Sequence, residues 1–189
     1  MKNITLEWVG PFNPCQEETH EFKPQNKPGI YIWAVGSKTE KFISYVGKAA
    51  NLKQRLYQHM VYMLGGSAYL YEPKKLKNAE ALENVYKPAP KDWNLNFIEN
   101  YSELSTCALE NLKAYEFFWV EFNLSNEYRK AVESGIINSV IKSGKDHMMQ
   151  INEISIYSVD SPAVNIVSNF PSDITLIGLD TEVVYGTNE

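Results

Sequence analysis

The chain of 189 residues has the length of one ordinary domain, and its 44% hydrophobic and 22% charged residues are typical of a globular protein. No apolar run approaches the ~18 residues of a membrane-spanning helix, and the N-terminus does not resemble a secretory signal. The two cysteines are too few for a disulfide framework, which favours a reducing, cytoplasmic setting.

The net charge of −5 is distributed unevenly along the chain. Residues 23–77 carry ten Lys or Arg against two acidic residues, a local charge of +8. Residues 78–189 carry seven basic and seventeen acidic residues, a local charge of −10. This asymmetry predicts that one face of the protein meets a polyanion. The alternative is a chance cluster of solvated lysines.

The first part of the chain predicts strands. Asn3–Trp8 alternates apolar and polar residues, as a half-buried strand does. Ile30–Val35 and Lys41–Val46 are β-branched and aromatic, and the short Gly/Ser loop between them predicts a hairpin. A symmetric hairpin would place Tyr31 directly opposite Tyr45, with Cβ atoms about 5 Å apart. A one-residue bulge would shift this register.

Lys48–Leu64 has the periodicity of a helix, and glycines follow it. An apolar stripe at helical spacing consists of Leu52, Leu56, Met60 and Met63. A second stripe consists of Lys48, Asn51, Arg55, His59 and Tyr62. The two stripes are roughly 100° apart, so the second follows the rim of the buried face.

The middle of the chain predicts short helices near Ala79–Tyr86 and Ser102–Ala114, and we interpret residues 66–114 as an insertion on a smaller core. Tyr115–Phe122 is aromatic and alternating, which predicts a third strand. A second long helix, with Ser125 as its cap, runs to about Ser143.

The C-terminal part has strand-like runs at Ile154–Val159, Ala163–Val167 and Ile174–Tyr185, whose pairing the sequence does not assign. No linker separates any part of the chain. The sequence therefore predicts one domain, 1–189, with a core at about 27–167 and a C-terminal extension at 168–189.

Glu133 is out of place on the second long helix, because it projects between Ile136 and Ile137. A carboxylate on an apolar flank is costly to bury unless it is paired or binds a cation. Glu133 is therefore a candidate metal ligand or general base, although a glutamate that reaches water at the rim fits the same position. Gly135 costs the helix about 1 kcal/mol, which suggests the close approach of another backbone.

Taken together, these residues resemble one family. Gly29-Ile30-Tyr31, Tyr45-Val46-Gly47, Arg55, His59 and Glu133 follow one another as in the GIY-YIG nuclease domain. The arginine lies ten residues after the second motif tyrosine, and the histidine lies four residues after the arginine. The second motif departs from the family pattern by having valine in place of isoleucine.

The resemblance implies an α/β fold, with a small central antiparallel or mixed sheet flanked by helices. It also implies a metal-dependent endonuclease that hydrolyses the phosphodiester bonds of nucleic acid, with double-stranded DNA as the expected partner. Glu133 would hold one divalent ion, Mg²⁺ or Mn²⁺, in each active site. Arg55 would bind the attacked phosphate, and Tyr45 would orient the attacking water. Pro162-Ala-Val-Asn165 resembles a later family motif, which makes Asn165 a candidate catalytic residue.

Other residues are candidates for binding the substrate: Gly29, Gly47, Lys48, Asn51 and Lys53. Lys48 and Asn51 suit phosphate positioning or helix capping. A compact catalytic domain with insertions is more similar to stand-alone restriction-type members of the family than to its repair or homing members.

Two residues compete as the general base. A tyrosine with a pKa near 10 costs about 4 kcal/mol to ionise at pH 7, so Tyr31 needs the metal, Arg55 or Lys48 to lower its pKa. His59, with an ordinary pKa near 6.5, needs no such help. The resemblance favours Tyr31 as the water activator, with His59 assisting.

Two other functions fit the same residues. The chain could be a nucleic-acid-binding module without turnover, or a protein-interaction regulator that acts through its acidic part. The sequence does not separate DNA from RNA, or single from double strands. It shows no interface either, although a double-strand cut with one active site per chain would suggest a homodimer.

Overall fold

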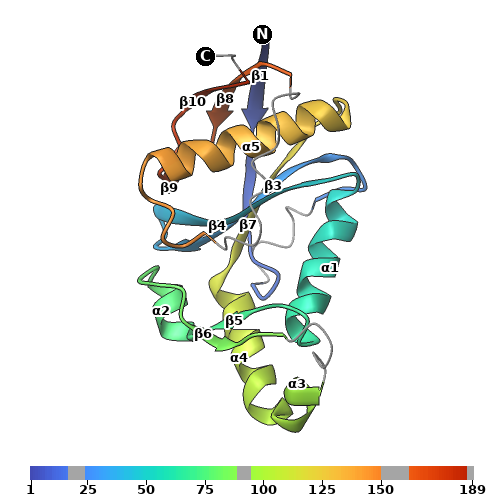
Figure 1. Cartoon of the computed structure of the whole chain (residues 1–189), viewed down its shortest axis with the longest axis vertical. Helices are drawn as coiled ribbons and strands as arrows, with labels where there is room; N and C mark the ends of the chain where they lie inside the picture. The colour runs from blue at the N-terminus through green and yellow to red at the C-terminus, as the bar shows by residue number, and fades with distance from the viewer. Residues whose placement is uncertain (17–23, 89–94, 150–161, 187–189) are drawn as a thin grey trace.

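The computed structural model of the chain describes residues 1–16, 24–88, 95–149 and 162–186 (Figure 1). Its strands are β1 (Lys2–Glu7), β2 (Val9–Phe12), β3 (Gly29–Gly36), β4 (Glu40–Ala49), β5 (Leu70–Tyr71), β6 (Asn84–Tyr86), β7 (Glu116–Glu121), β8 (Val164–Asn169), β9 (Thr175–Ile177) and β10 (Glu182–Tyr185). Its helices are α1 (Leu52–Leu64), α2 (Pro73–Lys77), α3 (Leu95–Glu99), α4 (Tyr101–Ala114) and α5 (Asn126–Lys142). None of these helices combines the length and the apolar character needed to cross a bilayer.

The central sheet has five strands in the order β2-β7-β3-β4-β9. β3 lies between β7 and β4 and pairs with both in the antiparallel sense, whereas β9 joins β4 in the parallel sense. A second sheet has the order β1-β8-β10, and β5 and β6 form a small ribbon. The predicted α/β class, with a small mixed sheet flanked by helices, is confirmed.

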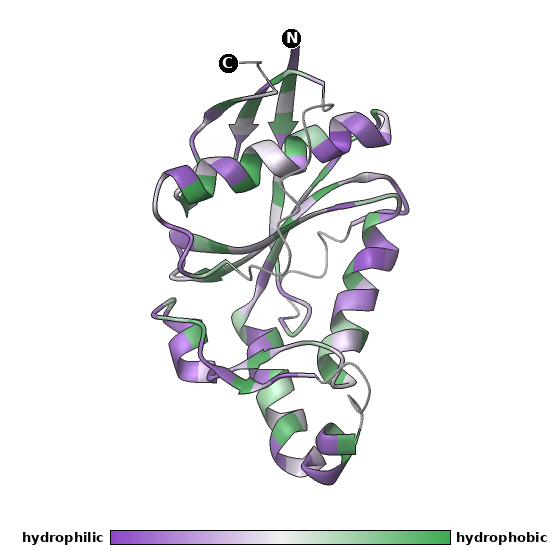
Figure 2. Ribbon diagram, viewed as in Figure 1, coloured by the Kyte–Doolittle hydropathy of each residue, from purple (hydrophilic) through white to green (hydrophobic). Residues whose placement is uncertain are grey.

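The two faces of the central sheet carry separate apolar cores. One face packs against α1, α4 and the β5–β6 ribbon, and the core there includes Tyr31, Leu56 and Phe117. The other face packs against α5 and the second sheet, around Ile32 and Ile136. Apolar and hydrophilic residues alternate visibly along α5 (Figure 2). Side chains in successive positions of β3 therefore enter opposite cores.

The hairpin register differs from the symmetric prediction. Trp33, not Tyr31, pairs with Tyr45, and Ala34 pairs with Ile43. Ser44 therefore has no partner on β3, which makes it the extra residue of a β-bulge. The direct pairing of Tyr31 with Tyr45 was wrong, because no residue pattern marks a bulge inside an apolar strand.

Several element boundaries also differ from the prediction. Residues 48 and 49 belong to β4, so α1 begins at Leu52 and not at Lys48. The helix predicted at Ala79–Tyr86 is wrong. α2 ends at Lys77, before this range begins, and the last three residues of the range form β6. Pro73 at the first helical position favours the earlier start of α2. α2, α3, β2, β5 and β6 were not predicted, and the strand predicted at Ile154–Val159 lies outside the described residues.

The C-terminal strands complete both sheets. β8 pairs in parallel with β1 and antiparallel with β10, while β9 extends the central sheet. α5 is buried around much of its circumference because it contacts both sheets. A Cβ on Gly135 would lie 2.7 Å from Cδ1 of Ile166 and 3.2 Å from Cβ of Tyr185. The close approach predicted at Gly135 therefore exists, but side chains make it and not another backbone.

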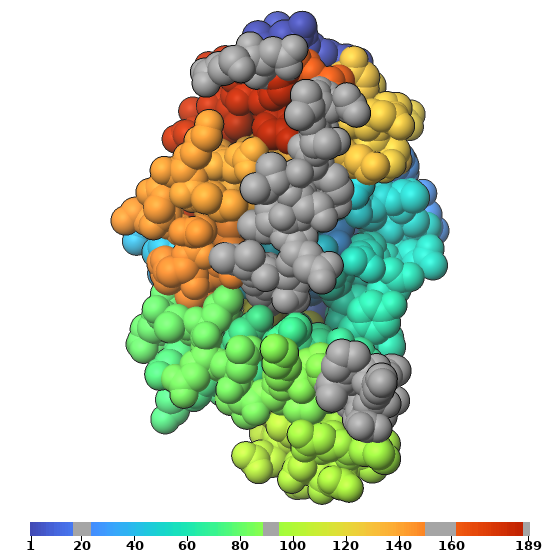
Figure 3. All heavy atoms as spheres, in the orientation of Figure 1, coloured from blue at the N-terminus to red at the C-terminus, as the bar shows by residue number. Residues whose placement is uncertain are grey.

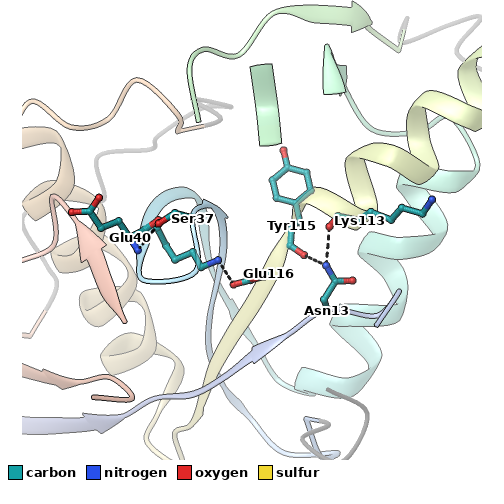
Figure 4. A network of polar contacts seen from close by, with 7 residues as sticks. Asn13, Ser37, Glu40, Lys113, Tyr115 and Glu116 are labelled. Atoms are coloured by element: carbon teal, nitrogen blue, oxygen red, sulfur yellow. Dashed lines mark hydrogen bonds and ion pairs between the residues drawn. The ribbon is translucent and has the colours of Figure 1, made fainter. Parts of the chain in front are cut away.

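Polar contacts join the first strands to the start of β7 (Figure 4). The amide of Asn13 donates to the carbonyl oxygens of Lys113 and Tyr115, at 2.9 and 3.0 Å. Lys41 is only 3% exposed, and its Nζ lies 2.7 Å from Oε2 of Glu116. A buried cation needs such a counterion, so this pair fixes the β4 side chain relative to β7.

Candidate active site

Tyr31, on β3, contacts two polar side chains of α1. Its hydroxyl oxygen lies 2.9 Å from Nε2 of His59 and accepts a 3.0 Å hydrogen bond from Nε of Arg55. Arg55 and His59 are about one helical turn apart, so both can face the strand. Since an arginine Nε–H can only donate, the Tyr31 hydroxyl keeps its own proton, and it can donate that proton to His59 in the tautomer whose Nε2 is unprotonated.

Two glycines permit this arrangement. Gly47, on β4, pairs with Tyr31, and a Cβ at that position would lie 2.4 Å from the Tyr31 hydroxyl oxygen. Gly29 begins β3, and a Cβ there would lie 2.2 Å from the carbonyl oxygen of Val120 and 2.6 Å from Cδ1 of Leu52. Gly47 therefore makes room for the tyrosine hydroxyl, whereas Gly29 makes room for α1 and β7. Gly29 and Gly47 were predicted to bind the substrate, and packing also explains why each of them is a glycine.

Aromatic rings surround the hydroxyl. The ring of Tyr45 is stacked on that of Tyr31, with centroids 5.9 Å apart, because Tyr45 lies two positions from Gly47, the β4 partner of Tyr31, and so shares its face. The His59 ring packs edgewise on Tyr45 at 5.4 Å and on Trp33 at 5.7 Å. Trp33 was missed as a site residue, although the alternation of β3 puts it on the same face as Tyr31.

A cavity of about 320 Å³ opens beside this cluster. Arg55, His59, Trp33 and Tyr45 line it, so polar and aromatic groups reach the same space. The remaining lining residues are Tyr62, Met63, Ser67, Ala68, Tyr69 and Tyr115. Residues 67–69 belong to the segment that we interpret as an insertion, and no sequence motif marks them.

Burial shifts the pKa values of the two candidate bases, Tyr31 and His59, in opposite directions. It raises the pKa of Tyr31 well above its usual range, and the nearby Tyr45 adds to this, although the Arg55 guanidinium opposes it. Burial lowers the pKa of His59 to about 3, with a further contribution from the positive charge of Arg55. At neutral pH, the pair is thus a neutral phenol and a neutral imidazole.

Glu133 is 8% exposed and lies against the end of β4. Its Oε2 is 3.1 Å from Nζ of Lys48. Burial raises the pKa of the Glu133 carboxyl, while the ammonium and the backbone N–H of Lys48, and then Arg55, work against this rise. The predicted glutamate at the apolar flank is therefore paired, and Lys48 connects it to the strand that carries Gly47.

The surroundings of Glu133 fit a divalent cation. Its Oε2 accepts no hydrogen bond of regular geometry from the described residues, and the ammonium of Lys48 is a cation already held against it. One carboxylate completed by waters and phosphate oxygens is an acceptable Mg²⁺ site. The described residues contain no cluster of three or more His, Cys, Asp or Glu side chains, so such a site would rest on Glu133.

The structure places three other predicted residues outside this cluster. Asn51 is the N-cap of α1, and its side chain accepts a 2.9 Å hydrogen bond from the backbone N–H of Gln54. Lys53 is exposed on α1. Asn165 lies on β8, in the second sheet, where its amide donates to Glu182 at 2.8 Å. Ile166, its neighbour, faces Gly135 of α5, so the alternation of β8 turns Asn165 away from the helix that carries Glu133.

The charge asymmetry of the sequence is partly cancelled in space. Four lysines of the basic segment form ion pairs with glutamates of the acidic part: Lys27–Glu121, Lys41–Glu116, Lys48–Glu133 and Lys75–Glu83. Lys53 and Arg55 form no ion pair with the described residues and share α1. The expected basic face is therefore smaller than the sequence suggests, and part of it lies at the active-site helix.

Comparison with known proteins agrees with this geometry. Residues 27–146 match the sequence model of the GIY-YIG catalytic domain. The chain belongs to the GIY-YIG nuclease superfamily. No curated protein and no solved structure matches the chain significantly. The GIY-YIG match covers β3, the hairpin, α1, β7 and α5, and thus includes the elements that carry Tyr31, Arg55, His59 and Glu133.

Proposed function

We propose that this GIY-YIG protein is a metal-dependent endonuclease that hydrolyses the phosphodiester bonds of DNA. The observation that supports this best is the Tyr31 hydroxyl, which is hydrogen-bonded to Arg55 and His59, two residues that line an open cavity. Phosphodiester hydrolysis needs a positive charge at the phosphate and a proton acceptor for the attacking water. Arg55 supplies the first, and the Tyr31–His59 pair supplies the second.

The hydrogen bonds of Tyr31 permit a proton relay. In the His59 tautomer whose Nε2 is unprotonated, Tyr31 donates its proton to that nitrogen while its oxygen accepts a proton from the attacking water, and no free phenolate is required. A bound phosphate favours this direction, because its negative charge raises the pKa of the His59 imidazole. Tyr31 is fully buried in the structure, whereas Arg55 and His59 line the cavity, so the attacking water would have to enter between these two side chains to contact the Tyr31 oxygen. His59 would then be the final proton acceptor.

Arg55 has two tasks in this arrangement. The first is to hold the Tyr31 oxygen through its Nε–H, while a 3.3 Å hydrogen bond from Nη1 to Oε1 of Gln58 orients the guanidinium. The second is to bind the phosphate. The guanidinium remains charged at all relevant pH values and can donate further hydrogen bonds to phosphate oxygens. Tyr45, stacked on Tyr31, restricts the space in which the water can lie.

Glu133 would hold a divalent metal, Mg²⁺ or Mn²⁺, after the Lys48 ammonium moves away from its carboxylate. When bound, the metal supplies charge stabilisation at the phosphate and at the leaving oxygen. Lys48 is then available for a phosphate oxygen. The described residues form one such site, so a cut through both strands of a duplex in a single event would call for a homodimer.

The proposal is tested by incubating supercoiled plasmid with the protein in Mg²⁺, Mn²⁺ or EDTA. We expect nicking or linearisation that EDTA abolishes. Glu133→Gln should remove it, because the neutral amide keeps the volume but loses the charge that attracts the metal. Glu127→Gln, on the exposed first turn of the same helix, is the matched control and should cut normally. Cleavage in EDTA, or equal cleavage by Glu133→Gln, would contradict the proposal.

A further inference from the structure

The cavity beside Arg55 and His59 extends beyond the groups that the hydrolysis uses. Its far wall is made of Ser67, Ala68 and Tyr69, which follow α1, and of Tyr115, which precedes β7. The atoms of the segment 66–114 that are described form the lower part of the molecular face in Figure 3, adjacent to α1. The catalytic centre and the segment 66–114 therefore share one cavity.

The wall of the cavity is strongly aromatic. Tyr62, Tyr69 and Tyr45 are partly exposed, whereas Trp33 and Tyr115 are buried behind the surface. Among the described residues, Tyr62 and Tyr69 pack against no other aromatic ring. The ammonium of Lys87 lies over the ring of Tyr69, with Nζ 5.7 Å from the ring centroid. Partly exposed rings of this kind are the surfaces on which nucleobases stack.

We propose that this cavity receives one unstacked nucleobase, from the nucleotide next to the phosphate that Arg55 binds. The inference rests on the proposed nuclease function and specifies its substrate. The cavity volume of about 320 Å³ lies within the range of sites that bind small planar ligands. Arg55 and His59 lie at the wall of the same cavity, so the phosphate and the base can be neighbours on one strand.

A base that occupies this cavity must be unstacked from its neighbours in the substrate strand. In a duplex, stacked neighbours cover both faces of a base, so the base must leave the stack before it contacts an aromatic wall. The strand is therefore unpaired at the cleavage position, or the protein extrudes one base there. Duplex regions on either side remain compatible with this geometry.

The test measures binding in EDTA, so it does not depend on cleavage. The probes are a fluorescein-labelled oligothymidylate and an oligonucleotide of the same length that consists of abasic sites. The wild type should bind the oligothymidylate about tenfold more tightly, which is the size expected for one base stacked on an aromatic ring. The sugar-phosphate backbone is the same in both probes, so Arg55 and Lys53 contribute equally to both.

Ala68→Trp fills the cavity without changing Tyr31, Arg55, His59 or Glu133. It should bind both probes equally, with the affinity that the wild type has for the abasic probe. Tyr69→Ala is the second variant, used if Ala68→Trp folds poorly. It removes one aromatic ring from the cavity wall and fills no space, and it should also lose most of the base preference. Tyr101→Ala removes an exposed ring of α4 outside the cavity and should keep the full preference.

The outcomes separate the two proposals. If the protein cleaves plasmid but the wild type binds both probes equally, the nuclease function stands and the base cavity is refuted. A preference that Ala68→Trp and Tyr69→Ala both retain also refutes it. If the plasmid is not cleaved, yet the preference exists and Ala68→Trp abolishes it, the base cavity is supported and the nuclease proposal fails.

Discussion

Tyr31 is the residue on which the polar contacts of the site converge, because its hydroxyl bonds to both Arg55 and His59. Tyr31→Phe removes this oxygen but keeps the stacking of the ring on Tyr45 and Phe117. We expect cleavage to fall by about 10²–10⁴, the usual contribution of a proton-transfer group, because the relay loses its middle member. Single-turnover cleavage measures this loss.

The same variant should remain folded. The loss of one hydrogen-bonded hydroxyl costs about 1 kcal/mol in the free energy of unfolding, and thermal denaturation checks that value. If Tyr31→Phe cleaved at the wild-type rate, His59 would have to activate the water directly and the relay would be wrong.

His59 makes stability depend on pH. Its pKa in the folded protein, about 3, lies below its ordinary value of 6.5, so the native state binds fewer protons than the unfolded state between these values. The stabilisation by neutral His59 is therefore complete above pH 6.5 and is lost as the pH falls through this window, by up to about 1.4 kcal/mol per pH unit.

Urea denaturation at several pH values measures this effect. His59→Gln cannot bind the proton, so its free energy of unfolding should fall less steeply than that of the wild type between pH 6.5 and 4. Equal slopes in the two proteins would show that the imidazole accepts a proton inside the folded site.

At the scale of the elements, Gly47 links the β3–β4 hairpin to the active site, because it leaves the space that the Tyr31 hydroxyl occupies. Gly47→Ala places a methyl group 2.4 Å from the Tyr31 hydroxyl oxygen, so the ring must move away from Arg55. We expect a loss of about 1–3 kcal/mol in stability, and cleavage reduced beyond what the unfolded fraction explains. Activity per folded molecule is the decisive quantity.

Gly29→Ala is the matched control for this variant. Its Cβ would collide with Val120 and Leu52 and would not contact Tyr31. It should destabilise the fold, while the folded molecules keep their cleavage rate. If both variants lowered the rate per folded molecule alike, the effect of Gly47 would be one of packing alone.

The hairpin also shows what the sequence could and could not predict. The β-branched and aromatic runs predicted the strands, and the helical spacing predicted that Arg55 and His59 lie together. The bulge at Ser44 was not predictable, because an extra residue in an apolar strand changes no local pattern. It nevertheless decides that Trp33, and not Tyr31, pairs with Tyr45.

The segment 66–114 was the least predictable element. Apart from α4, which the sequence predicted, its helices and strands are short and the strands pair only with each other, so local propensity gives little information. Its residues become part of the site only through tertiary packing, as Tyr69 and Ala68 do in the cavity. Asn165 illustrates the opposite case, because a sequence motif suggested a site residue that the second sheet turns elsewhere.

At the scale of the whole molecule, the distribution of charge decides how a polyanion approaches. Lys27, Lys41 and Lys48 have carboxylate partners contributed by the acidic part of the chain, so their positive charge is largely compensated. Arg55 and Lys53 are therefore expected to contribute most to the electrostatic attraction near the active site. The dependence of DNA affinity on salt reports the number of phosphates that such groups contact.

Lys53→Ala tests this expectation directly, because Lys53 is exposed on α1 and lies two positions from Arg55. Removing one phosphate contact should weaken DNA binding uniformly across sequences and reduce the slope of log K against log salt concentration by about 1. Fluorescence anisotropy with a labelled duplex, measured in EDTA over a salt series, gives both values.

Lys142→Ala changes an exposed lysine at the end of α5, across the central sheet from α1, and should leave the slope unchanged. If Lys142→Ala reduced the slope as much as Lys53→Ala, the polyanion would not be confined to the side of the molecule that carries Tyr31, Arg55 and His59.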